Sequence, residues 1–198
     1  LVAWAPSVPG SRKKTAGQSA ILLGHDRVLI VWRRSDVALG GRAVLYARDK
    51  SGDLVRHASV DLTGGLKPEI VGRLGRRVVI SEFNIGANYS AGQLRVFWSY
   101  DDGLVEESRL GDLFDPEVLS VSARKIRMRV LRKAAYSTGG PTFNRFELTI
   151  TKRRKGKVAF DLEPEDKGLD VLDRYCAAET SKDRRKLVKG KKLATRLP

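Results

Sequence analysis

The sequence predicts a mainly β protein: an antiparallel β-sandwich or barrel-like sheet of about ten strands, with a short C-terminal helix and a basic tail. Three observations predict this fold class. Apolar and polar residues alternate with a period of two in many short segments, as in half-buried strands. Turn-forming glycine and aspartate residues separate those segments. The chain of 198 residues is 41% hydrophobic, which is enough for one buried core and too high for general disorder.

The composition divides the chain into three parts. Residues 1–19 are rich in proline, glycine and basic residues, and we expect them to form a flexible arm. Residues 20–165 contain the strand-like segments and form the predicted β-rich domain. Residues 166–198 are predicted to form a short helix and a basic tail. The helix is expected over residues 169–179, where leucines recur at helical spacing near two aspartates.

Each strand-like segment is bounded by turn residues and is therefore predicted to be a strand. In chain order the strands are expected over residues 20–23, 27–34, 42–48, 54–60, 69–74, 77–83, 93–100, 104–110, 124–133, 145–151 and 157–162. The Asp-Asp-Gly sequence at 101–103 favours a tight hairpin turn. Residues 112–120 are ambiguous in pattern and could hold a helical turn.

The strand over residues 124–133 is the most informative about partners. Its alternation places Ile126, Met128 and Val130 on one side and Arg127 and Arg129 on the other. Residues 121–160, which contain this strand, hold twelve basic side chains and one acidic side chain. We therefore expect a sheet with one apolar face and one cationic face.

The charge of the whole chain indicates an anionic partner. The formal net charge is +15 and the isoelectric point is about 10.2, which attracts nucleic acid, anionic lipid, acidic glycans or an acidic protein surface. The predicted anion-binding residues are Arg124, Lys125, Arg127, Arg129, Arg132, Lys133, Arg153 and Arg154. A solvated, arginine-rich surface without a specific partner is the alternative interpretation. Residues 91–120 carry a net negative charge, so internal pairing would reduce the external field.

Residues 61–71 read Asp-Leu-Thr-Gly-Gly-Leu-Lys-Pro-Glu-Ile-Val and resemble the repeat of FG-GAP and VCBS-type β-propeller proteins. The residues in the pattern are Asp61, Thr63, Gly64, Pro68, Glu69, Ile70 and Val71. In that family, spaced acids in this loop bind calcium, and the resemblance implies oxygen ligands at Asp61, Thr63 and Glu69. Gly65 stands in place of the second acid of the pattern and Leu66 in place of the next glycine. This leaves too few hard ligands, so no metal is predicted. The alternative is a Gly-Gly loop between two strands.

The sequence predicts no catalytic residues and no cofactor. The chain has two histidines, His25 and His57, and one cysteine, Cys176. No Gly-x-Ser-x-Gly elbow, phosphate-binding glycine loop or dinucleotide fingerprint is present. A hydrolase in which His57 pairs with Asp61 is the remaining enzymatic alternative. Three acids of the central strands, Glu82, Glu106 and Glu107, are expected to be solvated.

The predicted strand over residues 93–100 carries aromatic side chains on both sides. Trp98 shares one side with Leu94 and Val96, and Phe97 shares the other with Arg95. An exposed Phe97 beside Arg95 could stack on a base or pack against a partner. The alternative, which we favour, is a strand that is buried on both faces.

These observations predict a non-enzymatic β-rich binding or structural module that docks onto a larger assembly or an anionic surface. The alternative is a nucleic-acid-binding protein that uses the basic strand face and the tail over residues 182–196. No apolar run is long enough to span a bilayer. Small residues at Ala3 and Ala5 favour a secreted or periplasmic protein, although Pro6 disfavours cleavage there, and a cytoplasmic protein is the alternative. The oligomeric state stays open.

Overall fold

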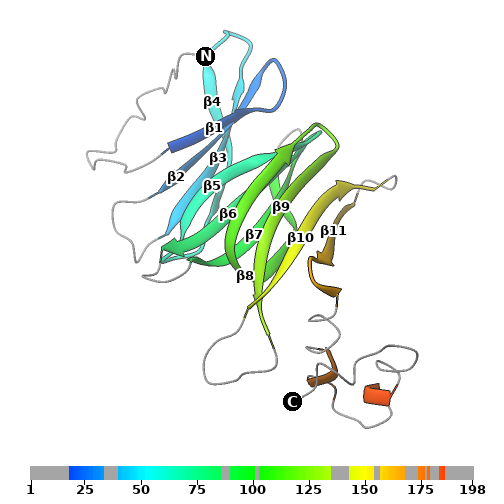
Figure 1. Cartoon of the computed structure of the whole chain (residues 1–198). Coiled ribbons are helices and arrows are strands. Elements are labelled where there is room, and N and C mark those ends of the chain that lie inside the picture. Colours follow the sequence, from blue (N-terminus) through cyan, green and yellow to red (C-terminus); the bar gives the residue numbers. More distant parts are fainter. Residues whose placement is uncertain are drawn as a thin grey trace.

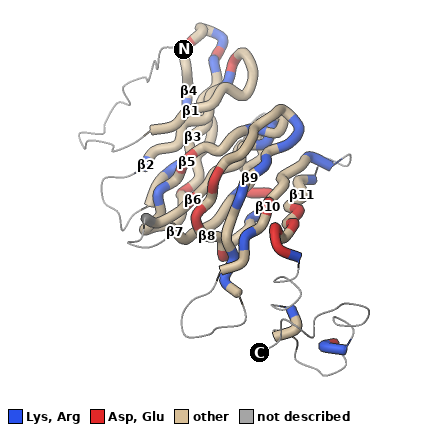
Figure 2. The backbone as a smooth tube through the Cα atoms, viewed as in Figure 1, with Lys and Arg blue, Asp and Glu red and all other residues tan. Residues whose placement is uncertain are grey.

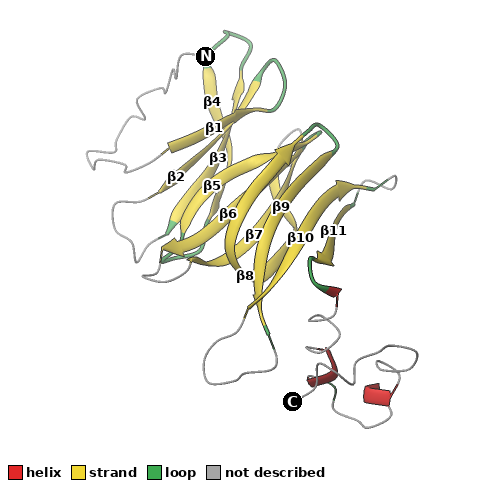
Figure 3. Cartoon of the chain, in the orientation of Figure 1, coloured by secondary structure: helices red, strands yellow, loops and turns green. Residues whose placement is uncertain are grey.

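The protein consists of two antiparallel β-sheets, one of four strands and one of seven. The computed structural model describes residues 18–33, 40–85, 90–100, 103–134, 143–153, 157–167, 174–176, 178 and 183–185. The prediction of a mainly β fold built from packed antiparallel sheets is confirmed, and the sheets are not closed into a barrel. The described helical residues form only single turns near the C-terminus (Figure 3).

Every strand pairs with its neighbour in sequence, except that β4 and β5 belong to different sheets. The first sheet has the order β1-β2-β3-β4 and the second β11-β10-β9-β8-β7-β6-β5. The strands are β1 (Gln18–Leu22), β2 (Arg27–Arg33), β3 (Gly41–Arg48), β4 (Leu54–Asp61), β5 (Lys67–Leu74), β6 (Arg77–Ile85), β7 (Ser90–Tyr100), β8 (Gly103–Val121), β9 (Lys125–Lys133), β10 (Phe143–Lys152) and β11 (Val158–Pro164).

Strand β8 is the corner of the seven-stranded sheet (Figure 1). Its first half pairs with β7 as far as Phe114, and its second half pairs with β9 from Phe114 onward. Asp112 and Asp115 adopt positive φ angles of 54° and 42° at this change of partner. A β-bulge bends a strand, so that its two halves can belong to two differently oriented walls of one sheet. Residues 112–120, for which a helical turn was considered, are therefore part of a long bent strand.

The bend lets the seven-stranded sheet fold over one apolar core. This inner core lies between the wall made by β5, β6 and β7 and the wall made by β9, β10 and β11. Ile126, Met128 and Val130 of β9 are all 1% exposed or less, which confirms the apolar side predicted for that strand. A Cβ atom placed on Gly72 of β5 would lie 2.7 Å from Val121 Cγ1, so the two walls meet closely there.

A second core joins the two sheets. The four-stranded sheet contributes Leu29, Val31 and Leu45, and the seven-stranded sheet contributes Ile80 and Phe97 from its outer side. Strands β6 and β7 are thus buried on both faces, which confirms the interpretation favoured for residues 93–100. The molecule is built in three layers, with β5, β6, β7 and the first half of β8 in the middle.

The predicted ends of the chain fall mostly outside the described residues. Of the predicted arm over 1–19, only Gln18 and Ser19 are described, and both belong to β1. Of the predicted helix over 169–179, residues 174–176 form a helical turn and Cys176 is exposed. In the part of the chain that the structure describes, no helix has the length and apolar character needed to cross a membrane.

Candidate functional site

Three hairpin turns of the seven-stranded sheet meet at one end of the molecule. Thr151 of β10 is opposite Lys125 of β9, so the β8–β9 and β10–β11 turns lie side by side. A Cβ atom placed on Gly75, in the β5–β6 turn, would lie 3.6 Å from Lys152 Nζ. The fold therefore brings together turns that are separated by about 75 residues of sequence.

These three turns form a basic rim. Its members are Arg73 and Arg76 from the first turn, Arg124 and Lys125 from the second, and Lys152, Arg153 and Lys157 from the third; all seven are exposed. None of the residues in 72–77, 121–127 and 151–158 is acidic. Figure 2 shows basic residues at the β8–β9 turn and at the end of β10.

Few carboxylates neutralise the rim. Arg153 lies 3.8 Å from a carboxylate oxygen of Asp161, and both side chains are mostly exposed. Such a pair contributes little and is screened by salt. Within the described part of the chain, no salt bridge involves Arg124, Lys125, Lys152 or Lys157. The rim thus has several cationic groups available for an anionic ligand.

The predicted cationic face of β9 differs from the rim, because neighbouring strands place acids opposite its arginines. Arg127 Nε and Nη2 each donate to a Glu147 carboxylate oxygen at 2.7 Å. Arg129 donates to Glu165 and to Glu117, also at 2.7 Å. The hydrogen bond from Arg127 lowers the pKa of Glu147 below its usual value. The middle of this face is therefore of mixed charge.

The predicted anion-binding residues separate into three groups. Arg124, Lys125 and Arg153 belong to the rim, and Arg127 and Arg129 belong to the mixed-charge face. Arg132 and Lys133 lie at the other end of β9, and Arg154 lies outside the described residues.

Four residues of the rim were not among the predicted anion-binding residues: Arg73, Arg76, Lys152 and Lys157. The available signal was their position in acid-free turns that flank predicted strands. Choosing among such turns required knowing which ones meet in space, and that depends on the corner in β8.

An exposed aromatic pair lies next to the rim. The Trp98 and Tyr100 side chains of β7 are 42% and 39% exposed, and their rings meet edge to face with centroids 5.8 Å apart. Arg77 packs on the Trp98 ring, with its Cζ 5.1 Å from the ring centroid. Phe97, the residue considered for base stacking, is completely buried in the core between the sheets. The exposed stacking surface is therefore on the Trp98 side of the strand.

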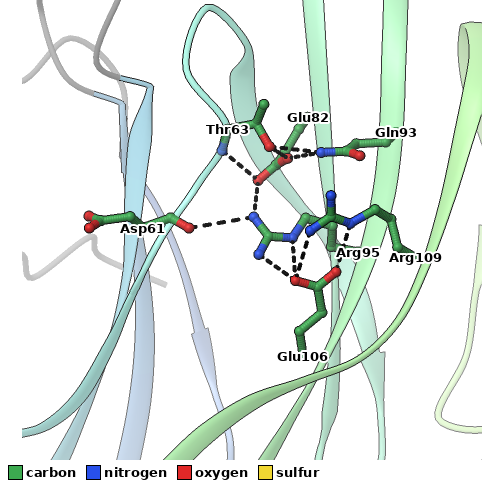
Figure 4. A network of polar contacts seen from close by, with 7 residues as sticks. All are labelled: Asp61, Thr63, Glu82, Gln93, Arg95, Glu106 and Arg109. Carbon is green, nitrogen blue, oxygen red and sulfur yellow. Dashed lines mark hydrogen bonds and ion pairs between the residues drawn. The ribbon is translucent and has the colours of Figure 1, made fainter.

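A buried charge network joins the middle layer to the loop that follows β4 (Figure 4). Glu82 is 0% exposed and accepts hydrogen bonds from Thr63 Oγ1 at 2.7 Å, Gln93 Nε2 at 2.6 Å and Arg95 Nη1 at 3.0 Å. The expectation that Glu82 is solvated was wrong, because its side of β6 is the side that packs toward the other sheet. Buried charges are tolerated when they are paired and hydrogen-bonded in this way.

The network continues outward to the surface. Arg95 Nε donates to Glu106 at 3.1 Å, and Arg109 Nε donates to the other oxygen of that carboxylate at 2.8 Å. The hydrogen bond from Arg109, together with that from Arg95, lowers the pKa of Glu106. Each charge has an opposite partner, so the network holds strands together and offers no unpaired group for chemistry.

The residues of the calcium-type loop have other partners. Arg42 Nε donates to the Asp61 carboxylate at 2.8 Å, Thr63 binds Glu82, and Glu69 forms a salt bridge with Lys67. Across the described ranges, no three His, Cys, Asp or Glu side chains are grouped so as to hold a metal ion.

The histidines considered for the hydrolase alternative are both exposed. His25 lies in the β1–β2 turn and His57 lies on β4. Asp61, the carboxylate considered as the partner of His57, is the residue that binds Arg42. The structure therefore provides no observation that favours this alternative.

Comparison of the sequence with known proteins adds no family. No protein-family model matches the chain, and no curated protein matches it either.

Proposed function

We propose that this protein is a non-enzymatic binding module that docks its basic rim onto an anionic surface. One observation carries the proposal. Three acid-free turns, distant in sequence, meet at one end of the molecule and expose seven cationic side chains.

The energetics support an anionic ligand at this place. Like charges gathered at one end repel one another, and among the described residues Arg124, Lys125, Lys152 and Lys157 form no salt bridge of the kind that compensates the arginines of the β9 face. A ligand that carries several negative groups would relieve the repulsion and release its own condensed counterions. Binding is therefore expected to weaken steeply as the salt concentration rises.

The first experiment measures binding of the full chain to inorganic polyphosphate, which supplies phosphates and nothing else. The rim variant combines Arg124→Gln, Lys125→Gln and Lys152→Gln. Because three phosphate contacts are lost, its affinity should fall about ten-fold or more, and the slope of log K against log salt should shrink by about 2 to 3 units. Fluorescence anisotropy or calorimetry between about 50 and 200 mM salt gives both quantities.

The matched control removes the same net charge from elsewhere. It combines Lys50→Gln, Lys133→Gln and Lys167→Gln, three exposed residues outside the rim. This variant should bind polyphosphate much more tightly than the rim variant. Equal losses in the two variants would show that only total charge matters, and failure of the unaltered protein to bind near physiological salt would overturn the proposal.

A further inference from the structure

We propose that the ligand of the basic rim is a single-stranded nucleic acid, whose phosphates contact the rim and whose bases stack on Trp98 and Tyr100. This inference rests on the proposed function and names the chemistry of its ligand. It combines the rim with the exposed aromatic pair, a feature that a purely electrostatic surface would not need.

Packing against neighbouring side chains holds the aromatic pair in place. Arg77 is 6% exposed and supports the Trp98 ring, while its Nη2 donates to Glu107 at 3.2 Å. Tyr100 packs edge-on against the same ring. The indole therefore has a supported side and keeps 42% of its surface open to solvent. A rigid, exposed ring of this kind is a suitable platform for a nucleobase.

The platform is adjacent to the rim through backbone contacts. Trp98 is opposite Arg77 in the β6–β7 register, and the Ser99 amide donates to the Arg76 carbonyl at 3.0 Å. Arg76 follows Gly75, where an added Cβ atom would lie 3.6 Å from Lys152 Nζ. Since paired strands are about 5 Å apart, Trp98 lies about one strand spacing from Arg77, the residue that follows Arg76 of the rim. A short nucleic acid segment can therefore reach both.

The combination of the basic rim with the aromatic pair favours single strands over duplexes. Proteins that bind single strands combine a basic track for the backbone with aromatic side chains for the bases, and every base has a face that can stack. In a duplex the base faces are already stacked and cannot reach Trp98.

The test compares ligands that share a phosphate backbone and differ in their bases. The probes are oligodeoxythymidine and oligouridine of about twelve nucleotides, within the usual range of site sizes, an abasic oligonucleotide of equal length, and a duplex. The two base-bearing single strands should bind about 5- to 150-fold more tightly than the abasic strand for each stacked base. The two sugars distinguish DNA from RNA as the source of the same chemistry.

The matched variants locate the stacking. Trp98→Leu and, independently, Tyr100→Leu should weaken binding of the base-bearing strands and leave polyphosphate and abasic binding unchanged. Trp32→Leu is the control, because Trp32 packs against Tyr46 in the other sheet, away from the rim. Tryptophan fluorescence should be quenched by oligodeoxythymidine in the unaltered protein and in Trp32→Leu, and not in Trp98→Leu.

The outcomes separate this inference from the proposed function. If base-bearing and abasic strands bind equally, or if Trp98→Leu changes nothing, single-strand recognition is overturned while polyphosphate binding still supports the rim. Tighter binding to phosphatidylserine vesicles than to any oligonucleotide would also overturn it, in favour of a membrane surface. Failure of the unaltered protein to bind polyphosphate would overturn both proposals together.

Discussion

Glu82 shows how a single side chain can define the way these sheets pack. The carboxylate is removed from water, and its hydrogen bonds from Thr63, Gln93 and Arg95 compensate the cost. Thr63 belongs to the loop after β4, whereas the other two donors lie on β7. The network therefore makes one position of that loop more favourable than others, since any shift would leave a buried charge without partners.

Removing Arg95 should destabilise the protein strongly. In Arg95→Met the Glu82 carboxylate stays buried and loses its counter-charge, so the free energy of unfolding should fall by about 3 to 5 kcal/mol. Urea denaturation followed by circular dichroism measures this change. Arg109→Met is the control, because Arg109 is an exposed member of the same network and its loss should cost less than about 1 kcal/mol. Equal effects of the two substitutions would contradict a special role for the buried pair.

The sequence contains a signal that Glu82 is buried, and the prediction of a solvated side chain did not use it. Glu82 continues the period of two that starts at Val78 and Ile80, both of which are buried. Periodicity alone would have placed it inward, whereas residue type favoured solvent. The alternation was sufficient for Ile126 and its neighbours, where pattern and residue type agree. It could not identify the Arg95 partner, because that contact depends on the pairing of two strands.

Strand β8 shows where the alternation of apolar and polar residues fails to predict a whole strand. A strand that passes from one pairing partner to another changes which of its sides is buried, so its alternation is interrupted. Here the interruption coincides with the positive φ angles of Asp112 and Asp115. The Asp115 carboxylate also accepts a hydrogen bond from the Ser90 amide at 2.7 Å, which ties the bend to the start of β7. A single sequence shows such a region only as a loss of periodicity.

The backbone conformation at Asp112 predicts that glycine is tolerated at this position of the strand. Asp112 is exposed and its φ of 54° lies in the left-handed region, which β-branched residues strongly disfavour. Asp112→Val should therefore lower the free energy of unfolding by about 1 to 2 kcal/mol. Asp112→Gly should stay within about 0.5 kcal/mol of the unaltered protein. Thermal denaturation of the two variants checks the difference, and equal stabilities would show that the bend does not need this conformation.

At the scale of the whole molecule, the charge pattern in space differs from the pattern in sequence. The longest basic run, residues 121–160, spreads over a mixed-charge face and two turns, and part of it is neutralised by Glu117 and Glu165 from outside the run. The rim takes five of its seven residues from the two turns of this run and adds Arg73 and Arg76 from the β5–β6 turn. Net charge predicted an anionic partner, but the proposed contact surface could be chosen only from the way the sheet folds over itself.

The three-layer arrangement also makes the two cores depend on one another. Val78 and Val79 are consecutive residues of β6, yet Val78 packs in the core between the sheets and Val79 in the inner core. The same holds for Val96 and Phe97 of β7. Unfolding of either outer layer would expose one face of these shared strands to water. The middle layer should therefore couple the two cores into one cooperative unit.

Core truncations on either side of the middle layer test this coupling. Leu45→Ala removes a side chain from the core between the sheets, and Leu148→Ala removes one from the inner core; both leucines are completely buried. Each should cost about 2 to 5 kcal/mol, because a cavity replaces packed methyl groups. Leu22→Ala, at a position that is 59% exposed, should change stability by less than about 0.5 kcal/mol. In urea, tryptophan fluorescence and far-ultraviolet circular dichroism should report one shared midpoint for every variant. A midpoint that moves for one probe alone would mean that the layers unfold separately, and the shared strands would then not couple the cores.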